Sequence, residues 1–173
     1  MHNDPMDHVD TILAQWRQER PDLDVSSMGT LGRIKLLWHH LSRDMDKTFA
    51  AHGLNAASFD MLATLRRAGM PYTMSPSDLM ASTLVTSGTM TNRIDQLEKA
   101  GLVERTPNPH DGRSLLVSLS AKGHALIEEA VAAHVQTQQR LVASLTDEQR
   151  SQLDELLRAF LTSVQDMERN GKT

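Results

Sequence analysis

The stretch SPSDLMASTLVTSGTMTNRIDQLEKAGLVERTPNPHDGRSLLVSL, residues 75–119, decides the fold. It opens with a helix start: Ser75 is a good N-cap, Pro76 suits the first helical position, and Asp78 can complete a capping box. A turn rich in hydroxyl and β-branched side chains then separates this short helix from a second one, which extends to about Ala100. The opening of the stretch therefore predicts two consecutive helices joined by a turn.

The second helix is followed by signals for two strands. Gly101 ends the helix in the usual place for a glycine. Residues 102–105 predict a strand, residues 106–113 a turn, and residues 114–119 a returning strand. Helix, turn, helix and a two-stranded wing make the winged helix-turn-helix arrangement. The helix itself has an apolar stripe at helical spacing, formed by Met90, Ile94 and Leu97.

The outer face of the second helix carries short polar side chains where long charged ones would be ordinary. Hydroxyls and an amide at a helix N-terminus suit base edges and phosphates in a DNA major groove, although a plain N-cap cluster would also explain them. In the wing, Asp111-Gly112-Arg113 places a cation at a loop tip, where it can enter a minor groove. The predicted DNA-binding residues are Ser77, Thr86, Ser87, Thr89, Thr91, Asn92 and Arg113.

The segment NRIDQLEKAGLVER, residues 92–105, followed by the wing residues 111–113, resembles the MarR family of bacterial regulators. The resemblance implies a winged helix that binds double-stranded DNA. The wing of that family often carries a second arginine where this chain has Gly112. One cation at the tip is therefore expected to make fewer wing contacts.

Composition excludes several classes of protein. The 173 residues suit a single domain with helical extensions, and no cysteine is present for disulfides, thiolate catalysis or cysteine-based zinc sites. No apolar run approaches the ~20 residues that a membrane span needs. The net charge is −4, but residues 31–122 hold eleven basic against eight acidic side chains, so the DNA-reading unit lies in the basic part. No phosphate loop or catalytic triad is recognisable, so we expect neither an enzyme nor a cofactor.

The helices on either side of the winged helix predict a dimer. We expect N-terminal helices in residues 4–53, the DNA-binding core in 54–119 and C-terminal helices in 120–173. A capping box at Thr146 opens a last helix whose apolar stripe is too long for a lone terminal helix. The terminal helices together suit a dimerisation bundle, and a two-fold dimer suits an inverted-repeat DNA site. The stripe consists of Leu153, Leu156, Leu157, Phe160, Leu161, Val164 and Met167.

Three further segments, QWRQERPDLD (15–24), SFDMLATLRR (58–67) and YTMSPS (72–77), resemble the PecS-type branch of the family, which is similar to urate-responsive regulators. The resemblance implies a urate response at Trp16, Asp60, Arg93 and Arg105. Their chemistry is suitable, because a tryptophan can stack on a purine and an arginine fork can hold an anion. In this interpretation Asp60 pairs with Arg93 in the empty protein.

Each of these four residues also has an ordinary explanation. Trp16 can be interface packing, the two arginines can contact phosphates, and Asp60 can be a simple salt-bridge partner. In the urate interpretation, Arg105 on the wing strand would instead hold the second helix relative to the wing.

The sequence thus predicts a mainly helical homodimer with a small β wing. We expect it to be cytoplasmic and nucleoid-associated, and to act as a repressor that a small anionic aromatic ligand, urate, releases from DNA. One alternative is a helical protein-interaction module. Another is a metal-responsive regulator that uses His40 and Asp44, which are four residues apart on one predicted helix.

Overall fold

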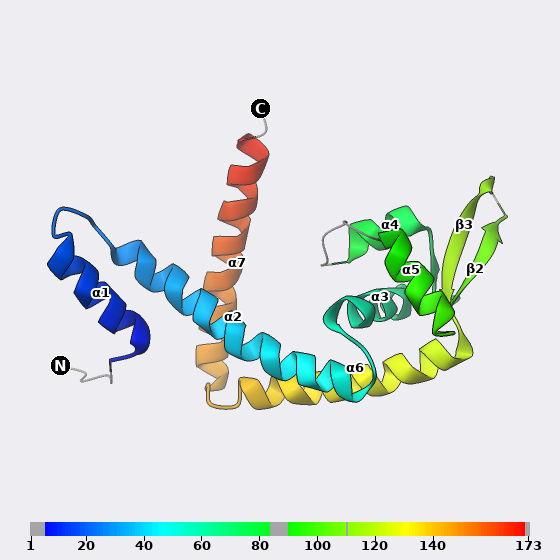
Figure 1. Cartoon of the computed structure of the whole chain (residues 1–173), viewed down its shortest axis with the longest axis horizontal. Coiled ribbons are helices and arrows are strands. Elements are labelled where there is room, and N and C mark those ends of the chain that lie inside the picture. The colour runs from blue at the N-terminus through cyan, green and yellow to red at the C-terminus, as the bar shows by residue number, and fades with distance from the viewer. Residues whose placement is uncertain (1–5, 84–89, 110, 172–173) are drawn as a thin grey trace.

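The computed structural model describes residues 6–83, 90–109 and 111–171, except for the side chains of 111–113. Two long helices run side by side, with the winged helix at one end, α1 at the other, and α7 projecting between them (Figure 1). Along the sequence, the winged helix is formed by the middle of the chain, and α1, α2, α6 and α7 come from the segments on either side of it. The flanking helices are α1 (His8–Glu19), α2 (Ser26–Ala51), α6 (Ala121–Leu141) and α7 (Asp147–Asn170).

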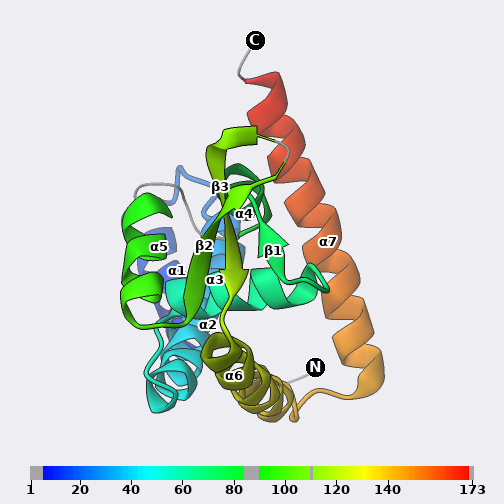
Figure 2. The same ribbon diagram turned by 90° about the vertical axis from the view of Figure 1, so that its right-hand side faces the viewer.

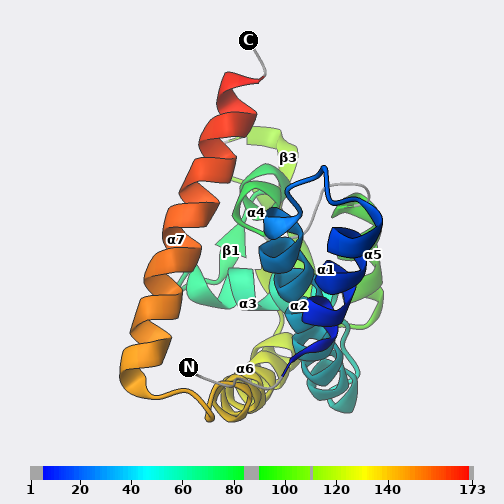
Figure 3. The same ribbon diagram turned by 90° about the vertical axis from the view of Figure 1, so that its left-hand side faces the viewer.

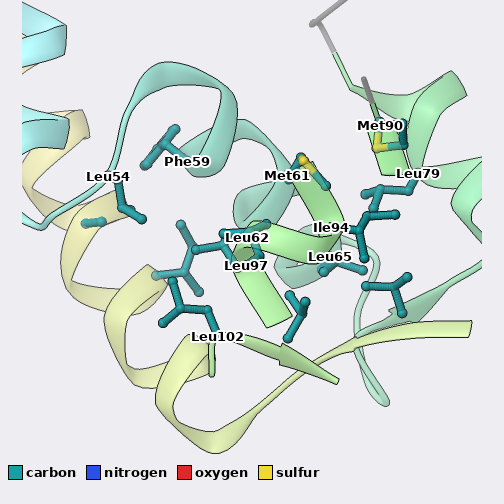
Figure 4. Close-up of a cluster of buried hydrophobic side chains, with 14 of the residues drawn as sticks. Leu54, Phe59, Met61, Leu62, Leu65, Leu79, Met90, Ile94, Leu97 and Leu102 are labelled. Carbon is teal, nitrogen blue, oxygen red and sulfur yellow. The ribbon is translucent and has the colours of Figure 1, made fainter. Parts of the chain in front are cut away.

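The core of the winged helix lies between α3 (Ala56–Arg67), α4 (Pro76–Ser82) and α5 (Met90–Lys99). Their apolar side chains converge on one cluster, which Figure 4 shows in close-up. The stripe predicted on α5 is confirmed, because all three of its members are buried. Each fully buried leucine or isoleucine contributes about 1.5–3 kcal/mol, so this cluster fixes the orientation of α5. Its fully buried large side chains include Met61, Leu62, Leu65, Leu79 and Ile94.

The wing differs from the sequence prediction in two ways. It has three antiparallel strands in the order β1-β3-β2, formed by Thr73–Met74, Asp111–Leu119 and Val103–Asn108, respectively. The predicted turn over 106–113 is wrong, since Asn108 pairs with Asp111. Pro107 suggested a turn, but β2 is an edge strand, where a missing N–H costs no ladder hydrogen bond. The two-residue β1 is too short to show an alternating pattern.

The predicted helix ends are largely confirmed. Gly101 ends α5 with φ of +70°, a left-handed conformation that glycine adopts without strain. Ser75 caps α4 by accepting from the backbone N–H of Asp78 at 3.1 Å. The second hydrogen bond of the predicted capping box is different. The Asp78 carboxylate accepts from the hydroxyl of Ser75 and not from the backbone N–H of Ser75. The box at Thr146 is complete, and it starts α7 as predicted.

The expected dimerisation faces are solvent-exposed in the single chain. No described residue of α7 is buried, and Leu156 keeps 70% of its surface exposed. On α2, the exposed apolar residues include Leu37 and Trp38. The two end-on views show α7 standing apart from the winged helix and from α1 (Figures 2 and 3). Exposed apolar side chains that are grouped on a helix are typical of a protein–protein interface.

Candidate DNA interface and ligand groove

The recognition helix α5 presents its polar first turn to solvent. Thr91 and Asn92 are exposed, while Met90 and Ile94 anchor the opposite face in the core. Ser77 is exposed at the start of α4. This geometry places predicted DNA-binding side chains on one accessible side of the helix-turn-helix. The predicted residues Thr86, Ser87 and Thr89 lie outside the described residues.

Arg113 has a different backbone position from the one predicted. The backbone of β3 begins at Asp111, so Arg113 is the third residue of a strand and not part of a loop tip. The reason is that the turn is shorter than its composition suggested, with a register shift at Pro107 and Asn108. The Arg113 side chain lies outside the described part of the chain.

Arg105 connects the wing to the recognition helix, as the sequence predicted. From β2, its guanidinium forms salt bridges with Asp95 and Glu98 on α5. The hydrogen bond to Asp95 and the charge of Glu98 raise the pKa of Arg105 above its ordinary value. Arg105 is 22% exposed, and its two partners are more exposed. The contact therefore sets the angle between α5 and β2 more than it stabilises the fold.

Arg93 lies in a groove between the end of α2, the start of α3 and the recognition helix. The groove has a volume of about 530 Å³. Arg93 forms no salt bridge within the described residues, so its guanidinium donors are available. The Arg93 groove, as we call it, is lined by Asp46, Ala50, Leu54, Asn55, Ala56, Ala57, Ser58, Asn92, Arg93 and Gln96.

The other two predicted ligand residues lie outside this groove. Trp16 is on α1, with 43% of its surface exposed, and Asp60 is partly buried on α3. The expected ion pair between Asp60 and Arg93 does not occur among the salt bridges of the described residues. Arg93 faces the first turn of α3, at Ser58 and the residues before it, and Asp60 takes part in another interaction.

Sequence reasoning missed the polar residues that share the groove with Arg93. Asp46 comes from α2, and Asn55 caps α3 by accepting from the backbone N–H of Ser58 at 2.9 Å. Gln96 lies one turn after Arg93 on α5. They belong to three separate elements, so no local motif joins them. The one available signal was the spacing of Asn92, Arg93 and Gln96 along a single helix face.

The described residues give little support for a metal site or for a membrane-spanning helix. The described residues contain no group of three or more His, Cys, Asp or Glu side chains placed to hold a metal ion. Asp44, a residue of the metal alternative, instead contacts Lys47 at 2.8 Å and Arg140 at 4.0 Å. The hydrogen bond from Lys47 lowers the pKa of Asp44. Among the described helices, none is long and apolar enough to cross a membrane.

Comparisons with known proteins identify the class. Residues 52–114 match the family model described as the MarR family. The regulator PecS of Dickeya dadantii (strain 3937) is 42% identical over 152 residues, which is 86% of this chain and 90% of PecS. The chain is thus a DNA-binding transcriptional regulator, and it is not an enzyme. It belongs to the MarR family.

Solved structures support the same assignment. A variant of MarR from E. coli in complex with operator DNA has a TM-score of 0.67 at 29% identity, over 84% of this chain and 97% of that one. Bordetella bronchiseptica BpsR has a TM-score of 0.66 at 27% identity, over 75% and 90%. The BpsR structure concerns the regulation of DNA binding by 6-hydroxynicotinic acid.

Proposed function

We propose that this regulator binds an inverted-repeat operator as a homodimer, represses transcription from there, and is released by a small anionic aromatic ligand, with urate as the first candidate. Chromosomal DNA as the target puts its site of action at the nucleoid, in the cytoplasm. The observation that carries the proposal is the Arg93 groove, because α5 forms one of its walls. A ligand bound there would touch the recognition helix directly.

The chemistry of the groove suits a flat anion with polar edges. Arg93 offers a planar fork of N–H donors that matches a delocalised anion. Asn55, Asn92 and Gln96 offer amide donors and acceptors for ring nitrogens and carbonyls. The volume of about 530 Å³ lies within the range of roughly 300–1,000 Å³ that is typical of small-molecule sites.

Release from DNA requires a ligand that prefers the DNA-incompetent conformation. Asn92 both lines the groove and lies on the exposed first turn of α5, so a ligand contact there competes with a DNA contact. The tie between Arg105 and Asp95 would carry a shift of α5 into the wing. Regulation of BpsR by an aromatic acid, and the similarity to PecS, support a ligand of this class.

The homodimer is supported by the apolar faces that the single chain leaves exposed. Helix α7 and the middle of α2 both lie between the winged helix and α1 (Figure 1), and both carry exposed apolar side chains. Stable interfaces bury about 800 Å² on each partner, and two helices of 24 and 26 residues can supply that area. Symmetric pairing would set two recognition helices on the two halves of an inverted repeat.

A mobility-shift titration of urate against a protein–operator complex tests the proposal, with the operator first selected from random DNA. We expect urate to weaken DNA binding by roughly 5- to 150-fold, which corresponds to about 1–3 kcal/mol of coupling. Arg93→Ala should abolish urate binding in calorimetry. Arg43→Ala removes the same charge from an exposed position of α2 outside the groove and should behave as wild type. Urate release that persists in Arg93→Ala would exclude the groove.

A further inference from the structure

We propose that Lys122, the second residue of α6, is a positioning residue for DNA binding: it holds the C-terminal end of the recognition helix α5 on the start of α6. Helix α6 leads away from the winged helix beside α2 (Figure 1). The contact would therefore fix the direction of α5 relative to the helices that carry the exposed apolar faces. This role goes beyond the proposed function, and only the second readout below rests on the proposed dimer and inverted repeat.

The C-terminal end of α5 needs partners for its carbonyl groups, because the last four carbonyls of an α-helix have none within the helix. The backbone carbonyl oxygen of Ala100 accepts from the Nζ of Lys122 at 2.8 Å. The ammonium group also lies at the negative end of the helix dipole, where a cation is stabilising. Lys122 thus provides a partner for the end of a helix to which it does not belong.

Ser120 makes a second connection at the same place. Its hydroxyl donates to the backbone carbonyl oxygen of Gly101 at 2.7 Å and accepts from the backbone N–H of Gly123 at 2.9 Å, which makes Ser120 the N-cap of α6. Its backbone N–H donates to the carbonyl oxygen of Leu102 at 3.1 Å. One residue therefore begins α6 and binds the turn that ends α5.

The backbones of the two segments touch at Gly123. A Cβ added to this buried residue would overlap the backbone carbonyl oxygen of Leu102, so a larger residue would force the segments apart. Glycine is the residue that permits such a close approach of two backbones. Packing of this kind leaves the end of α5 little room to slide along α6.

Lys122 adds a second point of attachment to this contact. Ser120 and Gly123 hold the turn that follows α5, and a helix held at one point can still tilt about it. The bond from Lys122 lies before that turn, at Ala100, and so resists a tilt. Because Arg105 ties the wing to α5, the wing would follow the same direction. Lys122 itself is exposed, so its loss should change this direction more than the stability of the fold.

Distances between two spin labels test this role without DNA or ligand. Because the chain has no cysteine, labels on Gln96→Cys in α5 and Glu129→Cys in α6 are the only two in each chain. Dilution with unlabelled chain confines the measured distances to one chain. We expect a narrow distance distribution in the parent protein and in its Lys122→Arg variant, which keeps a cationic donor. Lys122→Met should give a broader or displaced distribution.

Lys99→Met is the matched control, since it removes the same charge from an exposed position in the last turn of α5. Its distance distribution should stay narrow. An unchanged distribution in Lys122→Met, or equal broadening in Lys99→Met, would overturn the proposal. Urea titrations of all variants should give similar midpoints, which separates a change of position from a loss of folding.

DNA binding provides the second readout. A dimer with firmly directed recognition helices should prefer one spacing of the half-sites over the same operator with one base pair added between them. Lys122→Met should reduce this preference by at most about 10-fold, since one hydrogen bond cannot transmit more free energy than it contributes. The ratio of the two affinities cancels any phosphate contact of Lys122, because both operators offer the same backbone. Lys122→Arg and Lys99→Met should keep the wild-type ratio.

The outcomes separate this role from the proposed function. A wild-type ratio in Lys122→Met would contradict the positioning role. If the wild-type protein itself does not distinguish the two spacings, the proposed binding to an inverted repeat is wrong. The distances between the spin labels would then still decide the role of Lys122, because they need neither DNA nor a dimer.

Discussion

Arg105 on β2 is ion-paired with Asp95 on α5, so one guanidinium ties the wing to the recognition helix. Glu98, one turn further along α5, gives the same guanidinium a second carboxylate. The two DNA-contacting elements of a winged helix therefore move together. A ligand in the Arg93 groove, on another side of α5, would shift both of them at once.

Breaking this tie should weaken DNA binding more than it weakens the fold. For the Arg105→Met variant we expect a loss of stability of about 1 kcal/mol or less, since the partner carboxylates are largely exposed. A double-mutant cycle with Asp95→Asn, measured by mobility shift, should give a non-zero coupling energy for DNA affinity. Strict additivity of the two substitutions would show that the ion pair has no role in positioning the wing.

The Arg113 prediction concerns the salt dependence of binding. If this cation enters a minor groove from β3, Arg113→Ala should lower the slope of log affinity against log salt by up to ~1 unit. Arg158→Ala removes an exposed cation from α7 and is the matched control. A slope and affinity equal to those of wild type would remove Arg113 from the DNA interface.

Local signals in the sequence predicted the elements of the fold well. The N-cap at Ser75, the stop at Gly101 and the stripe at Met90, Ile94 and Leu97 each depend on residues within one helix, and each is confirmed. The wing was predicted less well. The strand β1 has two residues, and its pairing with β3 joins residues about 45 positions apart, which no local pattern reports.

The candidate ligand site could be predicted only in part. The likeness to a family pointed to Arg93, but Asp46 and Asn55 reach the groove only because α2 and α3 meet beside α5. The ion pair expected between Asp60 and Arg93 failed for a similar reason. Residue types compatible with a salt bridge do not determine which turn of α3 faces α5.

Removal of α7 should destroy the dimer. A chain that ends before residue 146 loses the exposed stripe, which includes Leu156 and Phe160. We expect it to sediment as a monomer or to aggregate, and to lose specific DNA binding, because a single recognition helix contacts one half-site. Leu156→Glu, a milder change at an exposed position, should give the same result in an intact chain. A dimer that survives both changes would place the interface elsewhere.

The stability of the fold should depend on pH through His134. This side chain of α6 packs against the rings of Phe49 and Phe59, with centroids 5.1 and 4.8 Å away, and its buried Nδ1 has no hydrogen-bond partner among the described residues. Burial lowers the pKa of His134, because it disfavours the charged ring.

The unfolded chain therefore binds a proton at this position at a higher pH than the folded chain does. The free energy of unfolding should fall as the pH drops below about 6.5, the ordinary value for histidine, until the folded state also becomes protonated. In urea titrations at several pH values, His134→Leu should lose part of this dependence. The same substitution at the exposed His39 should retain it. If the free energy of unfolding depends on pH in the same way for wild type, His134→Leu and His39→Leu, then His134 is not the source of the dependence.

The last prediction concerns the carboxylate that shares the groove with Arg93. Asp46 lines the groove from α2 and should repel an anionic ligand, so Asp46→Asn should tighten urate binding by about 2- to 5-fold, as expected for one partly solvated charge. The gain should shrink at high salt, since the position is exposed. By reciprocity, the variant should also leave DNA at a lower urate concentration. Asp60→Asn, which removes the same charge from a residue outside the groove, is the control for calorimetry and mobility shift. If Asp60→Asn tightens urate binding and Asp46→Asn does not, the anion lies nearer to Asp60, and Arg93 would hold it from the other side.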